Sequence, residues 1–400
     1  MEKEIKLSPA TGNAVPADEK KITHTHIALV GGQPHPVYGA IKALQPDRVA
    51  YIYSKDSQKQ LATLRKEINL PEIPQEQLDP TDPVKIQQRV NALVQQLKDD
   101  RVTINISSGS KPWSLFFSKG FDSHPNAEIL FVSQNNKLYN YTTLEQAEVT
   151  YNMEVLFRLK GNPLEHYRPY TDYTAKDKAA MRHILDAWEF APNKLRSLAS
   201  VLEKSEEARV KNDNKGIIKH PDGSTIDWNK STNMVNIHLQ KSGFKAKDFR
   251  LDSPHAVELA FNTHWFELYV ADMLSRWSGA DEIRMNCLFP QHGQNDNPQK
   301  NTKNEIDIVM YSNQKLLFVE CKTGIHQITD IDKFSNAVKN YGGSGSKAIF
   351  ITWNKMNPIQ IEKCQDSKVI RFCMKDYPNA KSREENLFKL LNREIKSINI

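Results

Sequence analysis

The sequence predicts an α/β protein in which a Rossmann-like N-terminal domain is followed by a connector and a second α/β domain. Strand-like and helix-like segments alternate over residues 22–145, which is typical of a mainly parallel sheet. That alternation is lost over residues 146–255, and regular patterning returns over residues 256–400. A chain of 400 residues is too long for one ordinary core, which favours two domains with a connector or small insert between them.

Composition narrows the class of protein. The chain is 39% hydrophobic and 26% charged, as in ordinary globular proteins, and it has no apolar run near the roughly 20 residues that a membrane-spanning helix needs. Residues 1–21 are polar, so we expect a loose tail rather than a secretion signal. The four cysteines form no CxxC pair, which favours reduced, buried thiols and a cytoplasmic location. The net charge of +6 is compatible with a phosphate-bearing partner but does not identify one.

In the N-terminal domain the expected elements follow one another closely. We predict strands at Thr25–Val30, Arg48–Tyr53, Val102–Ile106, Glu128–Val132 and Leu138–Tyr141. We predict helices at Pro36–Leu44, from the second strand through Ile68, at Val84–Lys98 and from Pro112 to Lys119. A turn at residues 134–136 joins the last two strands.

The connector carries two helical stretches, around residues 174–190 and 193–209, and a hairpin turn at Pro221-Asp222-Gly223. The C-terminal domain is expected to begin with one long amphipathic helix, Ala256–Arg276, followed by a polar loop that runs to Asn304.

Further elements of the C-terminal domain follow that loop. Two strands, Ile306–Tyr311 and Leu316–Lys322, are joined by Ser312-Asn313-Gln314, and a helix at about 330–341 leads to a strand at Ala348–Trp353.

The chemistry-bearing residues of the C-terminal domain lie on its two neighbouring strands. Asp307 is near the start of the first strand, and Glu320 and Lys322 end the second, two residues apart and therefore on one face, with Cys321 on the other. Two carboxylates can hold a divalent cation, which polarises a phosphoryl oxygen and lowers the pKa of a bound water. A lysine beside them can orient that water or stabilise negative charge on phosphate.

A simpler interpretation is an ion pair at a strand end, with Lys322 neutralising Glu320, and an isolated Glu-x-Lys favours that interpretation. The preceding helix, the apolar hairpin and the separation of Asp307 from Glu320 favour a nuclease site instead. The twelve histidines form no HExxH or zinc-finger spacing, and only His264 and His326 adjoin the proposed site.

These residues resemble the signature of the PD-(D/E)xK nucleases, in which an acidic residue and a hairpin precede (D/E)-x-K. The resemblance implies that Asp307, Glu320 and Lys322 are catalytic and that the cofactor is Mg2+ or Mn2+. It also implies a metal-binding glutamate on the preceding helix, which Glu267 matches, and a role for the backbone carbonyl of Cys321. Glu305, two residues before Asp307, is a further candidate ligand.

Two loops of the N-terminal domain follow predicted strands. Gly31-Gly32-Gln33 follows the first, and Ser107-Ser108-Gly109-Ser110 leads into the helix that begins near Lys111. A helix N-terminus binds phosphate through free N–H groups, and Lys111 adds positive charge. Both loops lie at carboxyl ends of parallel strands, where open α/β sheets bind ligands. A Gly-Gly pair after a strand is also common in simple tight turns, and neither loop matches a dinucleotide fingerprint or a P-loop.

The pair of segments GGQPHPV and N-x-S-S-G-S-K is similar to the two loop motifs of CARF domains, although serines replace a threonine and a glycine of the usual second motif. A CARF domain before a PD-(D/E)xK nuclease resembles the Card/Can group of type III CRISPR accessory nucleases. The resemblance implies a homodimer that binds a cyclic oligoadenylate, most often the tetra-adenylate, and then cleaves DNA or RNA. The residues expected to bind it are Gly31, Gly32, Gln33, Ser54, Lys55, Asn105, Ser107, Ser108, Gly109, Ser110 and Lys111.

Two other functions remain open from the sequence. One is a constitutive restriction- or repair-type endonuclease whose N-terminal domain binds DNA. The other is a nucleotide-binding regulator in which the nuclease-like domain is only a scaffold. The sequence does not distinguish DNA from RNA substrates, because no groove-reading element is apparent.

Overall fold

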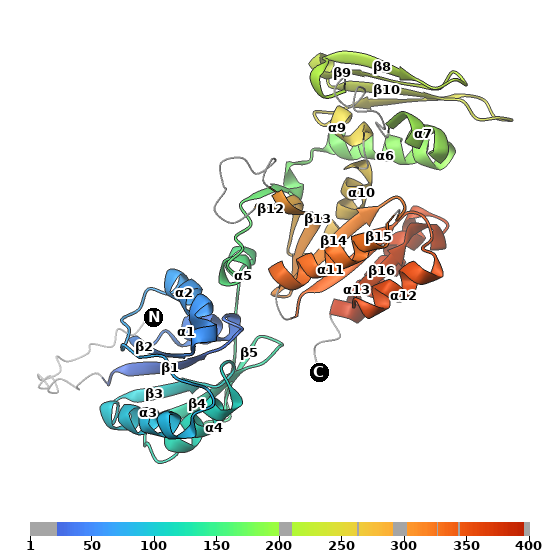
Figure 1. The fold of residues 1–400 in the computed structure, drawn as a ribbon. Coiled ribbons are helices and arrows are strands. Elements are labelled where there is room, and N and C mark those ends of the chain that lie inside the picture. The colour runs from blue at the N-terminus through green and yellow to red at the C-terminus, as the bar shows by residue number, and fades with distance from the viewer. Residues whose placement is uncertain are drawn as a thin grey trace, which may run out of the picture.

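The computed structural model describes residues 22–199, 210–261, 264–290, 302–325, 327–342 and 345–395. The chain forms an N-terminal domain, a small domain and a C-terminal domain, and a short helix, α5, lies between the first and the last (Figure 1). The polar tail expected at residues 1–21 lies outside the described residues, as do most of the polar loop before Asn304 and the end of the second connector helix.

The N-terminal domain is built on a six-stranded sheet of order β2-β1-β3-β4-β5-β6. The strands are β1 (His24–Val30), β2 (Arg48–Tyr53), β3 (Arg101–Asn105), β4 (Ala127–Val132), β5 (Lys137–Asn140) and β6 (Gln146–Glu148). The first four are parallel and the last two antiparallel, which confirms the mainly parallel sheet expected from the alternation. The edge strand β6 is too short and polar for a strand pattern, so it was not predicted.

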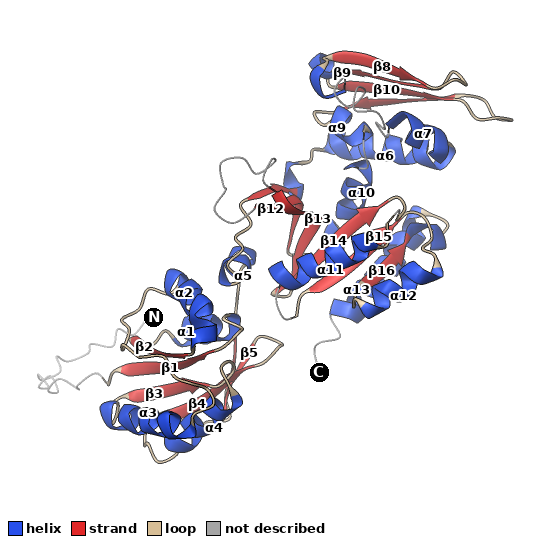
Figure 2. Ribbon diagram, viewed as in Figure 1, coloured by secondary structure: helices blue, strands red, loops and turns tan. Residues whose placement is uncertain are grey.

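Helices cover both faces of this sheet (Figure 2). They are α1 (His35–Leu44), α2 (Gln58–Glu67), α3 (Pro83–Gln96) and α4 (Lys111–Gly120). One core lies beneath α3 and α4 and another beneath α1 and α2, so the apolar residues of each strand are buried on both sides. All four helices match predicted ones, because their apolar residues recur at helical spacing.

The small domain packs α6 (Ala175–Phe190), α7 (Pro192–Ala199) and α9 (Ala256–Ala260) against a four-stranded antiparallel sheet. Its order is β11-β10-β9-β8, with bounds Lys215–Lys219 (β8), Thr225–Asn229 (β9), Met234–Leu239 (β10) and Lys247–Asp252 (β11). The expected hairpin turn joins β8 to β9, with Gly223 at a φ of 89°. Trp228, on β9, is buried in the core of this domain.

A second six-stranded sheet, of order β16-β15-β14-β13-β12-β7, forms the C-terminal domain. Its strands are β7 (His166–Pro169), β12 (Glu282–Pro290), β13 (Thr302–Ser312), β14 (Lys315–Lys322), β15 (Lys347–Thr352) and β16 (Ile370–Cys373). The helices are α10 (His264–Ser275), α11 (Thr329–Tyr341), α12 (Pro358–Asp366) and α13 (Ala380–Ile395). The predicted hairpin of β13 and β14 is confirmed, whereas β7 comes from the connector.

The single amphipathic helix predicted at Ala256–Arg276 is wrong in two respects. The structure has two helices, α9 and α10, because Phe261 leaves the helical conformation and packs its ring against Trp228 at a centroid distance of 5.6 Å. In addition, α10 is buried on all sides from Trp265 to Leu274, since it lies between α6 and the sheet of the C-terminal domain. A helix enclosed in this way has no solvent-exposed face over these residues.

The expected burial of the cysteines is observed for three of the four. Cys287, Cys321 and Cys364 are buried, Cys373 is partly buried, and all four are free thiols. Among the described residues, no helix combines the length and apolar character needed to cross a membrane.

Helix α5 (Met153–Leu159) belongs to two hydrophobic cores at once. Val155 and Leu159 pack with the N-terminal domain, whereas Met153, Leu156 and Phe157 pack with the C-terminal domain. The Phe157 ring lies 5.6 Å from Phe289 and 6.2 Å from Phe318, measured between ring centroids. The two domains are therefore joined through a packed helix rather than through an exposed linker.

We predict that Phe157→Ala lowers the free energy of unfolding by about 3–5 kcal/mol, because it empties a fully buried site in that shared core. Phe244→Ala is the matched control, since that ring is 64% exposed, and we expect a change within about 0.5 kcal/mol. Urea denaturation followed by circular dichroism measures both. Equal stability of the two variants would contradict the packing described for α5.

Candidate functional site: a carboxylate–lysine cluster and a pocket between two domains

The pairing of β13 with β14 brings three of the predicted catalytic residues together. Ile308 pairs with Val319, which places Asp307 and Glu320 at neighbouring positions one step further along the two strands. Glu320 and Lys322 are partly exposed while Cys321 between them is fully buried, so the predicted alternation of side chains is confirmed. The hairpin geometry therefore creates the cluster.

Lys322 bridges the two carboxylates. Its Nζ lies 2.7 Å from Glu320 Oε1 and 3.8 Å from Asp307 Oδ2. Asp307 also accepts a hydrogen bond of 2.7 Å from the backbone N–H of Cys321. Asp307 is thus fixed by the main chain of the opposite strand, while Lys322 remains 36% exposed and can reach a ligand.

Burial dominates the electrostatics of this cluster. It raises the pKa of Asp307 well above the usual carboxyl range, and the nearby Glu320 and Glu267 raise it further. Burial also raises the pKa of Glu320, although the Lys322 ammonium opposes that shift. For Lys322 burial acts to lower the pKa, but Asp307 and Glu320 together outweigh it, so the pKa is raised and the amine stays protonated. Asp307, Glu320 and Glu267 therefore lie near a single positive charge, the Lys322 ammonium.

Glu267 reaches the cluster from the first turn of α10. Only 8% of it is exposed, and His264 Nδ1 lies 3.4 Å from its Oε2. The hydrogen bond to Glu267 raises the pKa of His264 against the effect of burial. Glu305 is exposed on β13 and adds only a small electrostatic contribution at His264, and His326 lies outside the described residues.

The carboxyl groups of the cluster favour the binding of a divalent cation, but their present positions do not form a ready metal-binding site. Three largely buried carboxyl groups near one ammonium disfavour ionisation of them all, so a divalent cation would supply the missing positive charge, and oxygen ligands are those that Mg2+ and Mn2+ prefer. Within the described ranges, however, no three His, Cys, Asp or Glu side chains converge closely enough to form a ready metal-binding group. Lys322 instead occupies the space between Glu320 and Asp307.

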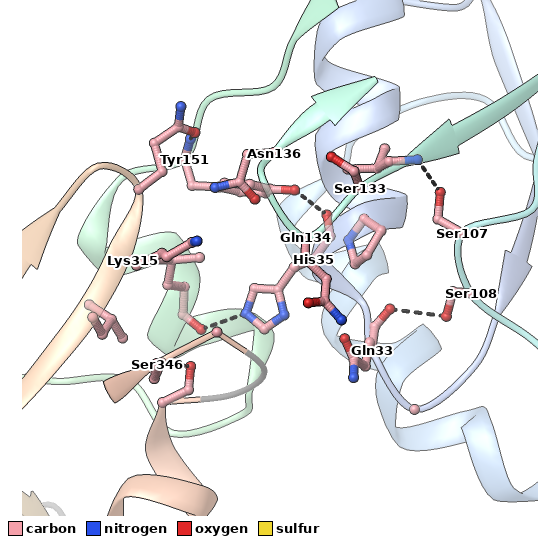
Figure 3. Close-up of a pocket in the computed structure, with 18 of the residues that line it drawn as sticks. Gln33, His35, Ser107, Ser108, Ser133, Gln134, Asn136, Tyr151, Lys315 and Ser346 are labelled. Atoms are coloured by element: carbon pink, nitrogen blue, oxygen red, sulfur yellow. Dashed lines mark hydrogen bonds between the residues drawn. The ribbon is translucent and has the colours of Figure 1, made fainter. Parts of the chain in front are cut away.

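A pocket of about 390 Å³ lies at the carboxyl ends of β1, β3 and β4 (Figure 3). Five of the predicted ligand residues line it: Gly32, Gln33, Ser107, Ser108 and Gly109. The loops are tied together, because Ser108 Oγ accepts a 3.0 Å hydrogen bond from the Gly31 N–H and donates one of 3.1 Å to the Gln33 carbonyl. The two predicted loops therefore form one continuous side of the pocket.

The other predicted ligand residues do not line this pocket. Asn105 supports it from behind, accepting a hydrogen bond from the Ser107 N–H and donating one to the Pro36 carbonyl. Ser110 caps α4, and Lys111 is exposed at its first residue. Ser54 and Lys55 belong to a capped turn after β2, where the Ser54 N–H donates to Ser57 Oγ. Gly31 supports the wall through its backbone.

The other sides of the pocket are lined by residues that the sequence did not predict. Ser133, Gln134 and Asn136 follow β4, and their only signal was the turn predicted at residues 134–136. The C-terminal domain contributes Gln314, Lys315, Leu316 and Ser346, for which the sequence has no local signal, because the two domains meet only in the folded chain.

Two family models match the chain. The Card1 CARF domain matches residues 25–159, and the endonuclease domain of Card1-like proteins matches residues 255–390. The chain belongs to the CARF nucleases of the Card/Can group. For this CARF nuclease, the N-terminal domain is the CARF domain and the C-terminal domain is the endonuclease domain, as the sequence resemblance implied.

Solved structures share the fold of this CARF nuclease over nearly its whole length. Can2 from Sulfobacillus thermosulfidooxidans, solved in complex with cyclic tetra-adenylate, has a TM-score of 0.64 at 15% identity, with 94% of this chain and 98% of that chain covered. VC1899 from Vibrio cholerae has a TM-score of 0.68 at 16% identity, with 93% and 98% covered.

A type III CRISPR defence DNA nuclease activated by cyclic oligoadenylate has a TM-score of 0.54 at 16% identity, with 96% of this chain and 54% of that chain covered. None of the curated proteins compared with the sequence matches it.

We predict that Asp307→Asn stabilises the metal-free protein. Because the folded-state pKa of Asp307 is raised, its ionisation opposes folding at every pH above the usual carboxyl pKa of about 4. The gain should therefore be absent below about pH 4, grow as the pH rises from there to the folded-state pKa, and level off above it at about 1–2 kcal/mol. Thermal unfolding in EDTA across that pH range measures it. Exposed Glu305→Gln is the control, and an Asn variant less stable than wild type at neutral pH would contradict the analysis.

Proposed function

We propose that this CARF nuclease hydrolyses phosphodiester bonds of DNA or RNA with Mg2+ or Mn2+, and that a cyclic oligoadenylate switches it on in type III CRISPR defence. The observation that carries the proposal is the cluster of Asp307, Glu320 and Lys322 on adjacent strands of an endonuclease domain. The gating half of the proposal is supported by the pocket that the CARF loops form.

In this mechanism Asp307 and Glu320 would hold the cation, and Glu267 and the Cys321 carbonyl are further candidate ligands. The bound cation would supply charge that polarises the scissile phosphate and acidifies a water. The Lys322 ammonium would act as a hydrogen-bond donor to the attacking water or to the phosphate. Because Lys322 bridges Asp307 and Glu320, a cation held by both carboxylates would compete with its ammonium for them.

The activator would bind the pocket at the ends of β1, β3 and β4. The bound state of Can2 supports cyclic tetra-adenylate as the first candidate, because that CARF relative was solved with it. A ring with two-fold symmetry would offer the same groups to the equivalent loops of two copies, so we propose a homodimer that shares one ring. Ring size and substrate type are the two variables that an assay must resolve.

We expect Lys322→Ala and Asp307→Asn each to reduce cleavage at least about 100-fold, because each removes a group that acts on the transition state. Asp307→Asn is the more informative variant, since it should be inactive and yet at least as stable as wild type. Exposed Lys339→Ala is the control and should retain full activity. Undiminished cleavage by either cluster variant would refute the assignment of these residues.

One cleavage experiment tests activation by measuring every combination of activator ring size, metal ion and nucleic-acid substrate. Cleavage of single- and double-stranded DNA and of RNA is measured with cyclic tri-, tetra- or hexa-adenylate or none, and with Mg2+, Mn2+ or EDTA. We expect activity only with both a ring and a divalent cation. Equal cleavage without any ring would overturn the gating proposal, while leaving the nuclease assignment in place.

A further inference from the structure

The activator pocket is not confined to the CARF domain. Figure 3 shows Lys315 and Ser346 of the endonuclease domain on the opposite side of the pocket from Gln33, Ser107 and Ser108. Lys315 is the first residue of β14, directly after the turn that joins β13 to β14. The same two strands carry Asp307, Glu320 and Lys322. A ligand in this pocket would therefore touch the hairpin that holds the catalytic cluster.

Lys315 is a cation without a counterion in the described part of the chain. No Asp or Glu described by the structure lies within ion-pair distance of its ammonium, and its side chain is partly buried. Burial lowers its pKa, and the neighbouring Lys347 lowers it further. An anion placed beside Lys315 would relieve both effects, because it would supply the missing opposite charge.

The turn before Lys315 is held against the CARF domain by hydrogen bonds. The Tyr151 N–H donates to Gln314 Oε1 at 3.2 Å, and Tyr311 Oη donates to the Tyr151 carbonyl at 2.5 Å. Tyr151 Oη in turn donates to the carbonyl of His35, the first residue of α1, at 3.1 Å. Lys315 is thus positioned at the pocket by contacts that do not use its own ammonium.

We propose that Lys315 binds a phosphate of the cyclic oligoadenylate, so that the endonuclease domain itself completes the activator site. The inference rests on the proposed function, since it assumes a nucleotide in this pocket. Lys315 would then link the ligand to the catalytic hairpin, with Glu320 five residues along the same strand, a distance of about 17 Å at the usual rise per residue.

The experiment measures binding separately from cleavage. Cyclic tetra-adenylate is titrated into the full-length protein in EDTA, with affinity measured by calorimetry, and the concentration giving half-maximal cleavage is then measured with Mg2+. Lys315→Met keeps the length of the side chain and removes its charge. We expect its affinity to fall about tenfold, the equivalent of 1.4 kcal/mol, with a parallel increase in the concentration needed for cleavage.

Two further variants separate a ligand contact from a structural role. Lys315→Arg retains the charge and should bind within about threefold of wild type. Lys339→Met is the matched control, because this exposed lysine of α11 does not line the pocket, and it should bind as wild type does. Melting temperatures in the absence of ligand verify that each variant is folded.

The outcomes distinguish this inference from the proposed function. If wild type binds the ring and Lys315→Met binds it equally well, the role of Lys315 is overturned while activation stands. If Lys315→Met and Lys315→Arg are weakened alike, the ammonium is not the recognising group and the inference is also overturned. If wild type does not bind cyclic tetra-adenylate at all, both the activator and the Lys315 contact are refuted, whatever the cleavage assay shows.

Discussion

The packing of α5 into two cores is the constraint on which the rest of this architecture depends. A seven-residue helix with one apolar face could attach to only one domain, but α5 is buried around most of its circumference. Its backbone also takes part, since His35 Nε2 lies 3.2 Å from the Leu156 carbonyl. The start of α1 and the hairpin of β13 and β14 consequently contact the same helix, and the pocket lined by Gln33 and Lys315 lies between them.

The cluster of Asp307, Glu320 and Lys322 differs from this packing, because forming it lowers the stability of the fold. Burying three carboxyl groups beside one ammonium is unfavourable unless further charge is supplied. The apolar hairpin provides the compensation, since Phe318 and Val319 of β14 are fully buried. Functional sites commonly retain such local conflict, and here it concerns the groups that a substrate phosphate and a cation would satisfy.

Sequence reasoning succeeded where the signal was local. The strands Thr25–Val30 and Leu316–Lys322 were predictable because their apolar residues are continuous and bounded by turn residues. The cluster was predictable because strand alternation alone puts Glu320 and Lys322 on one face. By contrast, β7 reads His-Tyr-Arg-Pro and has no strand pattern, so only its pairing with β12 makes it a strand. Lys315 gave no signal for the same reason: its significance arises from a domain far away in sequence.

The position of β7 has a consequence for the order of folding during synthesis. β7 ends at Pro169, whereas its partner β12 starts at Glu282, beyond the whole small domain. At roughly 5–20 residues per second, translation needs several seconds to cover that interval. The CARF domain can be complete by then, with the side of α5 that carries Phe157 still uncovered. During this stage of synthesis the apolar face of α5 that packs with the C-terminal domain therefore has no partner, because that domain has not yet been translated.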